Sequence, residues 1–457
     1  MIFMVGCFVS LYAQGPYRYR IHLTDKADTK YTLSHPEFFL SEKALERRNK
    51  QGVVVDSTDL PVCRSYLMKI ANCGVDIIHC SKWNNTVLIE SSDTIKIEEI
   101  VKLPFVRKVR KVWTCPFSVP FRDADRKKCV TNKYTADTTY YGVASYQVLM
   151  LNIDKLHNLG FKGRGMAIAV IDGGFYNADA VKLLQNVRIE GIHNFVNGFD
   201  VFGESDHGLK VLSCMAANEP NVMVGTAPEA SYWLLCSEDS DSECLAEEDY
   251  WAAAVEFADS VGVDIVNTSL GYSSFDDKNT SYIYSQLDGR SSLISKSASM
   301  AADKGMVVVC SAGNEGNKTW KKITVPADAD QVLTVGAVNR SRINAVFSSV
   351  GNTTDGRVKP DVMALGERSA VVDVDGTTEW ANGTSFASPT LCGAVACLWQ
   401  ACPSLTAKQL IELVRKAGDR AETPDNIFGY GIPDFWKAYQ FGTGLISNEV
   451  RDIDSSK

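Results

Sequence analysis

The sequence lacks a long apolar run, a Cys-x-x-Cys pair and any excess of positive charge. Its 457 residues carry a formal net charge of -8, so the chain as a whole is not attracted to nucleic acid or to an anionic membrane. None of the thirteen cysteines has the paired spacing that is typical of structural zinc. No run after the N-terminus reaches the length of a membrane helix. We therefore expect neither a nucleic-acid partner nor a transmembrane segment.

The N-terminus is apolar but short. Residues 1–13 contain no Lys or Arg, resemble a secretory signal with a weak n-region, and are too short to cross a bilayer. We interpret 1–14 as a signal peptide and expect a protein that is secreted or held in the cell envelope. A buried N-terminal strand is the alternative. Lipidation of Cys7 is a further alternative, which the very short run before it disfavours.

The cysteines near apolar segments leave one pairing open. Cys236 and Cys244 flank the polar loop 237–243, and they either close a small disulfide or remain two thiols. Cys310, Cys392 and Cys397 lie in apolar runs, so we expect buried free thiols there.

A small α+β domain is predicted at the N-terminus. A charged helix is expected at 41–51, capped by Ser41. Without it the order is β-α-β-β-α-β, which is the ferredoxin-like split unit. The elements of that unit are expected at 17–23, 60–72, 75–80, 86–90, 94–103 and 106–113. This domain has an ordinary size for an independent unit.

Basic residues outnumber acidic ones between 101 and 133, with clusters at 107–111 and 126–128. Such a stretch suits a nucleic-acid patch or a solvated, protease-accessible linker, and the acidic chain favours the linker. We place a domain boundary near Asp137, so that 15–136 holds the small domain and linker. A larger domain then covers 137–445, and 446–457 is a polar tail expected to be disordered.

The larger domain has the pattern of an α/β fold. Continuous apolar strands are expected at 166–171, 232–235, 265–268, 306–310 and 332–338, with helices between several of them at 207–218, 248–260 and 292–303. Strands of this kind are buried on both faces, so the alternation predicts a largely parallel sheet with helices on both faces. In such sheets the chemistry lies at the carboxyl ends of the strands.

Two candidate catalytic groups follow this rule. Asp172 comes directly after the first strand and before two glycines, although a lone Asp there is more often a cap or turn former. His207 opens a helical stretch in Asp-His-Gly. Of the six histidines in the chain, only His157, His193 and His207 belong to the α/β part. His207 is the best-placed base, although a single His beside Gly is usually structural.

Three further segments complete a set of reactive groups. Ser385 lies in Asn-Gly-Thr-Ser before the apolar run 390–401, so its hydroxyl would sit at a helix N-terminus, where backbone N–H groups stabilise an oxyanion. Asn314 follows a buried strand in a Gly-rich loop and could donate an amide N–H to that oxyanion. The segment 269–271 also follows a buried strand and could pair with an extended peptide. Taken singly, each is more often a cap or a turn.

The order Asp, His, Asn, Ser makes the combination specific. The chain resembles the subtilisin-like serine peptidases (subtilases) over roughly Met150 to Ala438. The segments that carry this resemblance are Ala-Val-Ile-Asp-Gly-Gly at 169–174, Asp-His-Gly at 206–208, Asn-Thr-Ser-Leu-Gly at 267–271, Ser-Ala-Gly-Asn-Glu-Gly at 311–316, Val-Lys-Pro-Asp at 358–361 and Asn-Gly-Thr-Ser-Phe-Ala-Ser-Pro at 382–389. Six blocks agree in the family order.

The resemblance implies a role for each residue. Ser385 would be the nucleophile, His207 the general base and Asp172 the group that orients His207. Asn314 and the backbone N–H of Ser385 would form the oxyanion hole. The substrate-binding walls would be Ser269, Leu270, Gly271 and Gly313.

Other expectations follow from the same resemblance. The small N-terminal domain resembles a subtilase propeptide, which acts as an intramolecular inhibitor until it is cut away. We thus expect a secreted serine endopeptidase, made as a zymogen, that processes itself and cleaves proteins or peptides without a cofactor. Structural calcium is common in the family, but no acidic loop matches a recognised calcium spacing, so it stays open.

Two departures and two alternatives accompany this hypothesis. Leu209 replaces the usual threonine after His-Gly, which could alter packing behind the imidazole, and Phe386 stands where methionine is common.

A non-catalytic peptide-binding protein of the same fold is the main alternative. An esterase is a poor one, because its elbow would need Gly-x-Ser-x-Gly and the order Ser, Asp, His.

Overall fold

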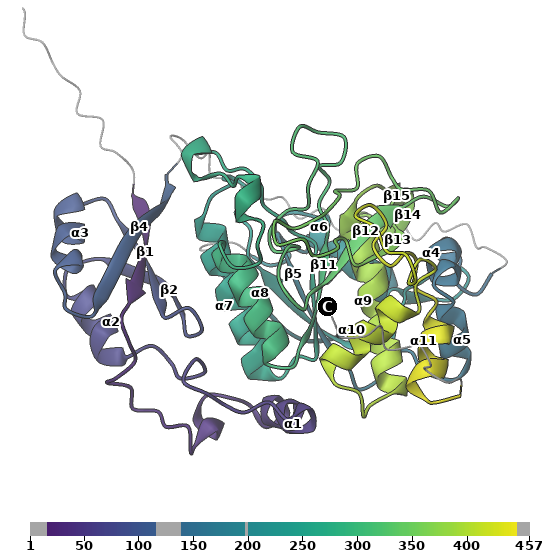
Figure 1. The fold of residues 1–457 in the computed structure, drawn as a ribbon, viewed down its shortest axis with the longest axis horizontal. Helices are drawn as coiled ribbons and strands as arrows, with labels where there is room; N and C mark the ends of the chain where they lie inside the picture. The colour runs from purple at the N-terminus through teal and green to yellow at the C-terminus, as the bar shows by residue number, and fades with distance from the viewer. Residues whose placement is uncertain (1–15, 116–138, 197–199, 446–457) are drawn as a thin grey trace, which may run out of the picture.

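The computed structural model describes residues 16–115, 139–196 and 200–445 (Figure 1). The segments interpreted as signal peptide and polar tail lie outside the described residues, as do Cys7, the second basic cluster and the expected boundary near Asp137. Below, residues 17–114 are called the small domain and residues 139–445 the large domain. Each is built on its own sheet.

The small domain has the predicted ferredoxin-like arrangement. Its four strands form an antiparallel sheet in the order β2-β3-β1-β4. Ile21 of β1 and Val87 and Ile89 of β3 pack with Ile70 and Ile100 of the helices, and all five are fully buried. The elements are β1 (Tyr17–Leu23), η1 (Pro36–Phe38), α1 (Glu42–Gln51), α2 (Arg64–Ala71), β2 (Asp76–Ser81), β3 (Thr86–Ser91), α3 (Thr94–Val101) and β4 (Val106–Thr114).

Two details of this domain differ from the sequence-based expectation. Helix α2 begins at Arg64 rather than at residue 60, since Pro61 disfavours helical backbone at the residue before it. The first basic cluster, 107–111, is part of strand β4 and not of the linker. Because β4 is an edge strand, its exposed Lys and Arg side chains protect the open edge against pairing with another chain.

The large domain is organised around a parallel sheet of seven strands, in the order β13-β12-β11-β10-β5-β9-β6. These strands are β5 (Ala167–Asp172), β6 (Arg188–Asn194), β9 (Ser231–Cys236), β10 (Ile265–Thr268), β11 (Val307–Ser311), β12 (Leu333–Val338) and β13 (Val362–Leu365). Two small hairpins are formed by β7 (Asn218–Glu219) with β8 (Met223–Val224), and by β14 (Ser369–Val372) with β15 (Thr378–Ala381).

Helices cover both faces of this sheet, as predicted (Figure 1). The helices of the large domain are α4 (Ser145–Met150), α5 (Ile153–Asn158), α6 (His207–Ala216), α7 (Ala246–Val261), α8 (Leu293–Asp303), α9 (Thr384–Ala401), α10 (Ala407–Lys416) and α11 (Phe435–Gly442), with 3-10 turns at Lys182–Leu184, Lys278–Thr280 and Tyr284–Gln286.

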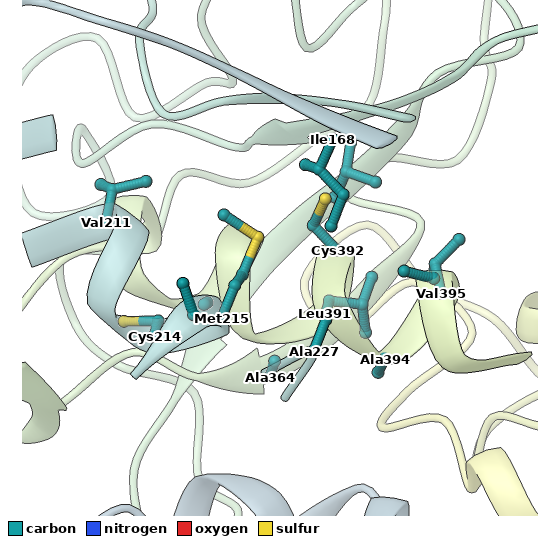
Figure 2. Packing of buried hydrophobic residues seen from close by; sticks show 14 of the residues in the cluster. Ile168, Val211, Cys214, Met215, Ala227, Ala364, Leu391, Cys392, Ala394 and Val395 are labelled. Atoms are coloured by element: carbon teal, nitrogen blue, oxygen red, sulfur yellow. The ribbon is translucent and has the colours of Figure 1, made fainter. Parts of the chain in front are cut away.

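The alternation of side chains along β5 divides the interior into two cores. Ile168 and Val170 face the core shared with α6 and α9, whereas Ala169 and Ile171 face the core shared with α7 and α8. Figure 2 shows the first core, in which side chains of α6 and α9 meet beside Ile168. Since both faces of β5 are covered, every residue of this strand is buried.

The small domain rests on α7 of the large domain (Figure 1). Arg20 of β1 donates to Asp249 of α7 through Nε at 2.8 Å and Nη2 at 2.6 Å. Near the other end of α7, Arg48 bonds Asp259 at 2.7 Å. These charged side chains are buried, so the two domains share a contact that excludes water.

The cysteines within the described residues of the large domain are separate thiols. Cys236 and Cys244 are both buried and unbridged, which is the second of the two alternatives left open by the sequence. Cys310, Cys392 and Cys397 are buried free thiols, as expected. No helix within the described ranges combines the length and the apolar character that a bilayer crossing needs.

Candidate active site

Asp172 and His207 meet where β5 ends and α6 begins. Asp172 is the last residue of β5 and is fully buried, while His207 is the first residue of α6. The Nδ1 atom of His207 lies 2.8 Å from Oδ1 of Asp172, which also accepts the N–H of Gly173 at 2.8 Å. This arrangement fixes the imidazole plane and leaves Nε2 directed away from the carboxylate.

Two glycines permit this close approach. The N–H of Gly208 donates to the carbonyl of Gly174 at 2.9 Å. A Cβ on Gly208 would lie 2.3 Å from that oxygen, and a Cβ on Gly174 would lie 2.2 Å from the carbonyl oxygen of Glu204. Side chains at either position would therefore separate α6 from the turn that carries Asp172.

The environment of His207 favours its protonated form. Burial lowers the pKa of His207, but the charge and hydrogen bond of Asp172 outweigh it, with smaller contributions from Glu238 and Asp206. The pKa is raised to about 9. The imidazole therefore holds a proton strongly once it has accepted one.

Ser385 is the second residue of α9 and is almost fully buried, at 7% exposure. Its hydroxyl donates to the carbonyl of Ser269 at 3.2 Å, and its own carbonyl accepts the hydroxyl of Ser269 at 2.9 Å. Within the part of the chain that the structure describes, no hydrogen bond joins Ser385 to His207. Both side chains border one cavity.

Asn314 is oriented by the residue before the serine. Its Oδ1 accepts the backbone N–H of Thr384 at 2.9 Å and the Thr384 hydroxyl at 3.0 Å. Because the oxygen is held in this way, the Nδ2 group remains available as a donor. The start of α9 and the loop after β11 are thus joined through Thr384.

His207, Asn314 and Ser385 all line one cavity of about 280 Å³. Its walls come from the loops that follow β9, β10 and β11 and from the starts of α6 and α9. The lining residues are His207, Glu238, Glu243, Ser269, Leu270, Gly271, Ser311, Gly313, Asn314, Glu315, Lys318, Thr324 and Ser385. Every residue for which the sequence indicated a site role lines this cavity, except Asp172, which lies behind His207.

The other histidines of the large domain lie elsewhere. His157 is buried between the Tyr141 hydroxyl and the Thr226 carbonyl, and burial lowers its pKa to about 4. His193 packs against the rings of Phe195 and Phe257. Neither borders the cavity that contains Ser385.

The two departures from the family pattern are accommodated by packing. Leu209 is fully buried in the core that α6 shares with α9. The ring of Phe386 lies 5.8 Å from the imidazole of His207 and is tilted by 45° to it. Both side chains therefore support the position of α6 and its first residue.

Sequence reasoning gave no site role to six lining residues, namely Glu238, Glu243, Ser311, Glu315, Lys318 and Thr324. Glu238 lies just beyond the carboxyl end of β9, so the strand-end rule that found Asp172 could also have found it. Thr324 lies in an irregular segment after the Asn314 loop, where no pattern of the sequence indicates a site.

The described residues contain no cluster of side chains that is suited to binding a metal ion. No group of three or more His, Cys, Asp or Glu side chains is arranged there to hold an ion. The side chains present thus do not fit a calcium site of that kind.

Comparisons with known proteins agree with this geometry. Residues 163–431 match the model of the subtilase family, and residues 18–128 match the peptidase S8 propeptide domain of Bacteroidota. Subtilisin DY of Bacillus licheniformis is 29% identical over 279 residues, which cover 60% of this chain and 89% of that protein. Subtilisin NAT of Bacillus subtilis subsp. natto is 28% identical over 308 residues, covering 66% and 69%. The subtilase match spans more than half of the chain, and the protein therefore belongs to the subtilase family, as a serine endopeptidase that carries an N-terminal propeptide domain.

Proposed function

We propose that Asp172, His207 and Ser385 form the catalytic triad of a secreted endopeptidase that is made as a zymogen and processes itself. The observation that carries this proposal is the 2.8 Å hydrogen bond between Asp172 and His207 beside the cavity that contains Ser385. The substrates are proteins or peptides that bind in extended form along 269–271 and Gly313.

Each residue has one task in the reaction. The Ser385 oxygen attacks the scissile carbonyl carbon while Nε2 of His207 takes the hydroxyl proton. When the tetrahedral intermediate collapses, the C–N bond breaks and His207 gives that proton to the leaving amine. Water, deprotonated by His207, then attacks the acyl-enzyme and releases Ser385. Asp172 holds the Nδ1 proton and stabilises the imidazolium, so no cofactor is needed for these transfers.

The oxyanion is stabilised by Asn314 and by the start of α9. The Nδ2 group of Asn314 and the backbone N–H of Ser385 donate to the oxygen that becomes negative. The N-terminus of α9 adds a favourable dipole at the same place. Thr384 contributes indirectly, because it fixes which face of the Asn314 amide points to the cavity.

The zymogen consists of four parts in this proposal. Residues 1–14 are the signal peptide, 15–136 the propeptide with its linker, 137–445 the catalytic domain and 446–457 a tail. Trp113, at the end of β4, donates its Nε1 proton to Ser242 at 2.9 Å. Ser242 belongs to the loop that also carries Glu238 and Glu243. The end of β4 therefore lies against a loop that lines the cleft, which supports inhibition of the cleft by the propeptide. The mature enzyme is released outside the cell or into the envelope.

The second candidate function is a peptide-binding protein that does not cut. The hydrogen bond from Ser385 to the Ser269 carbonyl favours it, because the serine then points away from His207. The Asp172–His207 pair weighs against it, since a buried carboxylate beside an imidazole serves no purpose in binding alone.

A comparison of Ser385→Ala with the unaltered chain tests the proposal. We expect the unaltered protein to release its N-terminal domain, to react with a serine-directed phosphonate and to hydrolyse a denatured protein. The Ser385→Ala variant should do none of these while keeping the same circular dichroism spectrum. Equal processing and hydrolysis in both would exclude Ser385 from catalysis. Absence of labelling in the unaltered, processed protein would favour the binding function.

A further inference from the structure

Across the described residues, three carboxyl groups line the cavity beside Ser385, but only one Lys or Arg side chain does. Glu238, Glu243 and Glu315 border it, together with Lys318. The Nζ atom of Lys318 lies 2.9 Å from Oε1 of Glu315, so these two form a pair. Among the described residues, no Lys or Arg lies within ion-pair distance of Glu238 or Glu243. Glu238 and Glu243 therefore face the cavity without an ion-pair partner of the Lys or Arg type, although the charge of protonated His207 acts on Glu238.

Glu238 is placed next to the catalytic pair. A Cβ on Gly173 would lie 3.1 Å from Oε2 of Glu238, which puts this carboxyl group beside the turn that follows Asp172. Burial and repulsion by Asp172 raise the pKa of Glu238 to about 8, although the charge of His207 opposes this. Burial and repulsion by Asp276 raise the pKa of Glu243 to about 7, although Lys278 opposes this. A cation that entered the cavity would relieve the repulsion at both groups.

Thr324 adds an unsatisfied hydroxyl to the same cavity. Its side chain is only 3% exposed, and Oγ1 has no hydrogen-bond partner among the described residues. This oxygen lies between two glycines, 2.2 Å from where a Cβ of Gly271 would stand and 2.8 Å from that of Gly313. A buried polar atom without a partner is costly. Its presence in a wall of the cavity therefore points to a polar group of a ligand.

We propose, building on the function proposed above, that this cavity selects substrates with a Lys or Arg side chain at one of the last two residues before the scissile bond. The ammonium or guanidinium group is held by Glu238 and Glu243, and the Thr324 hydroxyl accepts one of its N–H groups. An apolar side chain would bury the same carboxyl groups and hydroxyl without partners, and an acidic one would be repelled. Selection thus acts through the groups that the wrong side chain leaves unpaired.

Peptide hydrolysis by the self-processed enzyme measures this selection. The concentration of active enzyme is first determined by phosphonate labelling. Peptides that carry Arg, Lys, Leu or Glu at the last and at the second-last position before the cut are then compared by kcat/KM. We expect Arg or Lys at one of these positions to exceed Leu by about tenfold or more, because Leu would leave the buried polar groups unpaired. Labelled enzyme that prefers Leu or Glu at both positions would overturn the inference while leaving the proposed function intact. Absence of both labelling and hydrolysis would overturn the proposed function, and this inference with it.

Substitutions test whether Glu238, Glu243 and Thr324 cause the preference for a Lys or Arg side chain. The double variant Glu238→Gln with Glu243→Gln keeps side-chain shape, and we expect its ratio of Arg to Leu hydrolysis to fall about tenfold. The ratio is used because any effect of Glu238 on the basicity of His207 cancels in it. Glu422→Gln, an exposed position that does not line the cavity, is the matched control and should leave the ratio unchanged. Thr324→Val replaces only the hydroxyl by a methyl group, and we expect a smaller fall in the ratio of Arg to Leu hydrolysis. This variant tests the assignment independently if the double variant is not processed. Unchanged ratios in the double variant and in Thr324→Val would overturn the assignment.

Discussion

At the scale of single residues, the unusual feature is the number of acidic groups around His207. A general base must be neutral before it can accept the serine proton. Asp172, Glu238 and Asp206 all favour the protonated imidazole and raise its pKa to about 9. The enzyme thus gains a well-oriented histidine whose neutral form accumulates only as the pH rises through that value.

This gives a prediction for the dependence of activity on pH. In the proposed mechanism the neutral form of His207 is the active one, so kcat/KM should rise with pH and level off above about 9. Glu238 raises the pKa of His207 through its negative charge, so Glu238→Gln should lower that pKa and move the rising limb to lower pH. The measurement is a profile of kcat/KM against pH on a substrate with Leu before the cut, which avoids any effect on cationic substrates. If kcat/KM rose over the same pH range in Glu238→Gln as in Glu422→Gln, the coupling between Glu238 and His207 would be contradicted.

At the scale of elements, the site depends on how closely α6 approaches the end of β5. The five inner strands of the large sheet were predictable because each is a continuous apolar run, whereas the short edge strand β13 was not predicted. The strand β6 was harder, since it is an edge strand with partly exposed residues and so lacks a continuous apolar run. The order of strands and the 2.8 Å contact between Asp172 and His207 were not predictable, because they depend on packing between segments 35 residues apart.

The contact between the start of α6 and the turn after β5 provides a test at this scale. Gly208→Ala places a methyl group against the carbonyl of Gly174, so α6 must move away from Asp172. We expect a loss of stability of about 1–3 kcal/mol, which is typical of overpacking, and a fall in kcat/KM, measured by urea unfolding and by hydrolysis.

Gly165→Ala serves as the control for that variant. Gly165 has a φ of +85° and no atom within 4 Å of an added Cβ, so alanine there is strained only by its backbone. Stability should fall by about 1 kcal/mol, but kcat/KM should be unchanged. If Gly208→Ala lost stability and kept full kcat/KM, the approach of α6 would not determine the position of His207.

At the scale of the whole molecule, buried charges join the propeptide to the catalytic domain. Arg20 and Asp249 are 3% and 4% exposed, and Arg48 and Asp259 are 1% and 0% exposed. The partners of each pair lie more than 200 residues apart, so no local pattern of the sequence predicts them. The sequence predicted a small inhibitory domain at the N-terminus. Only the structure shows that this domain contacts the catalytic domain through α7.

Such an interface should be sensitive to the loss of one partner. Arg20→Met would leave Asp249 and Glu248 buried without their cation, and breaking a buried pair in this way costs about 3–5 kcal/mol. Arg164→Met is the matched control, because the pair of Arg164 with Glu229 is exposed on the arginine side by 78% and exposed pairs contribute only about 0–1 kcal/mol. Both changes are made in the full-length Ser385→Ala protein, so that processing does not remove the propeptide, and urea unfolding is followed by tryptophan fluorescence. We expect Arg20→Met to lower the unfolding midpoint clearly more than Arg164→Met, with earlier proteolysis of the small domain. Equal midpoints in the two variants would mean that apolar packing, and not the buried ion pairs, holds the propeptide on α7.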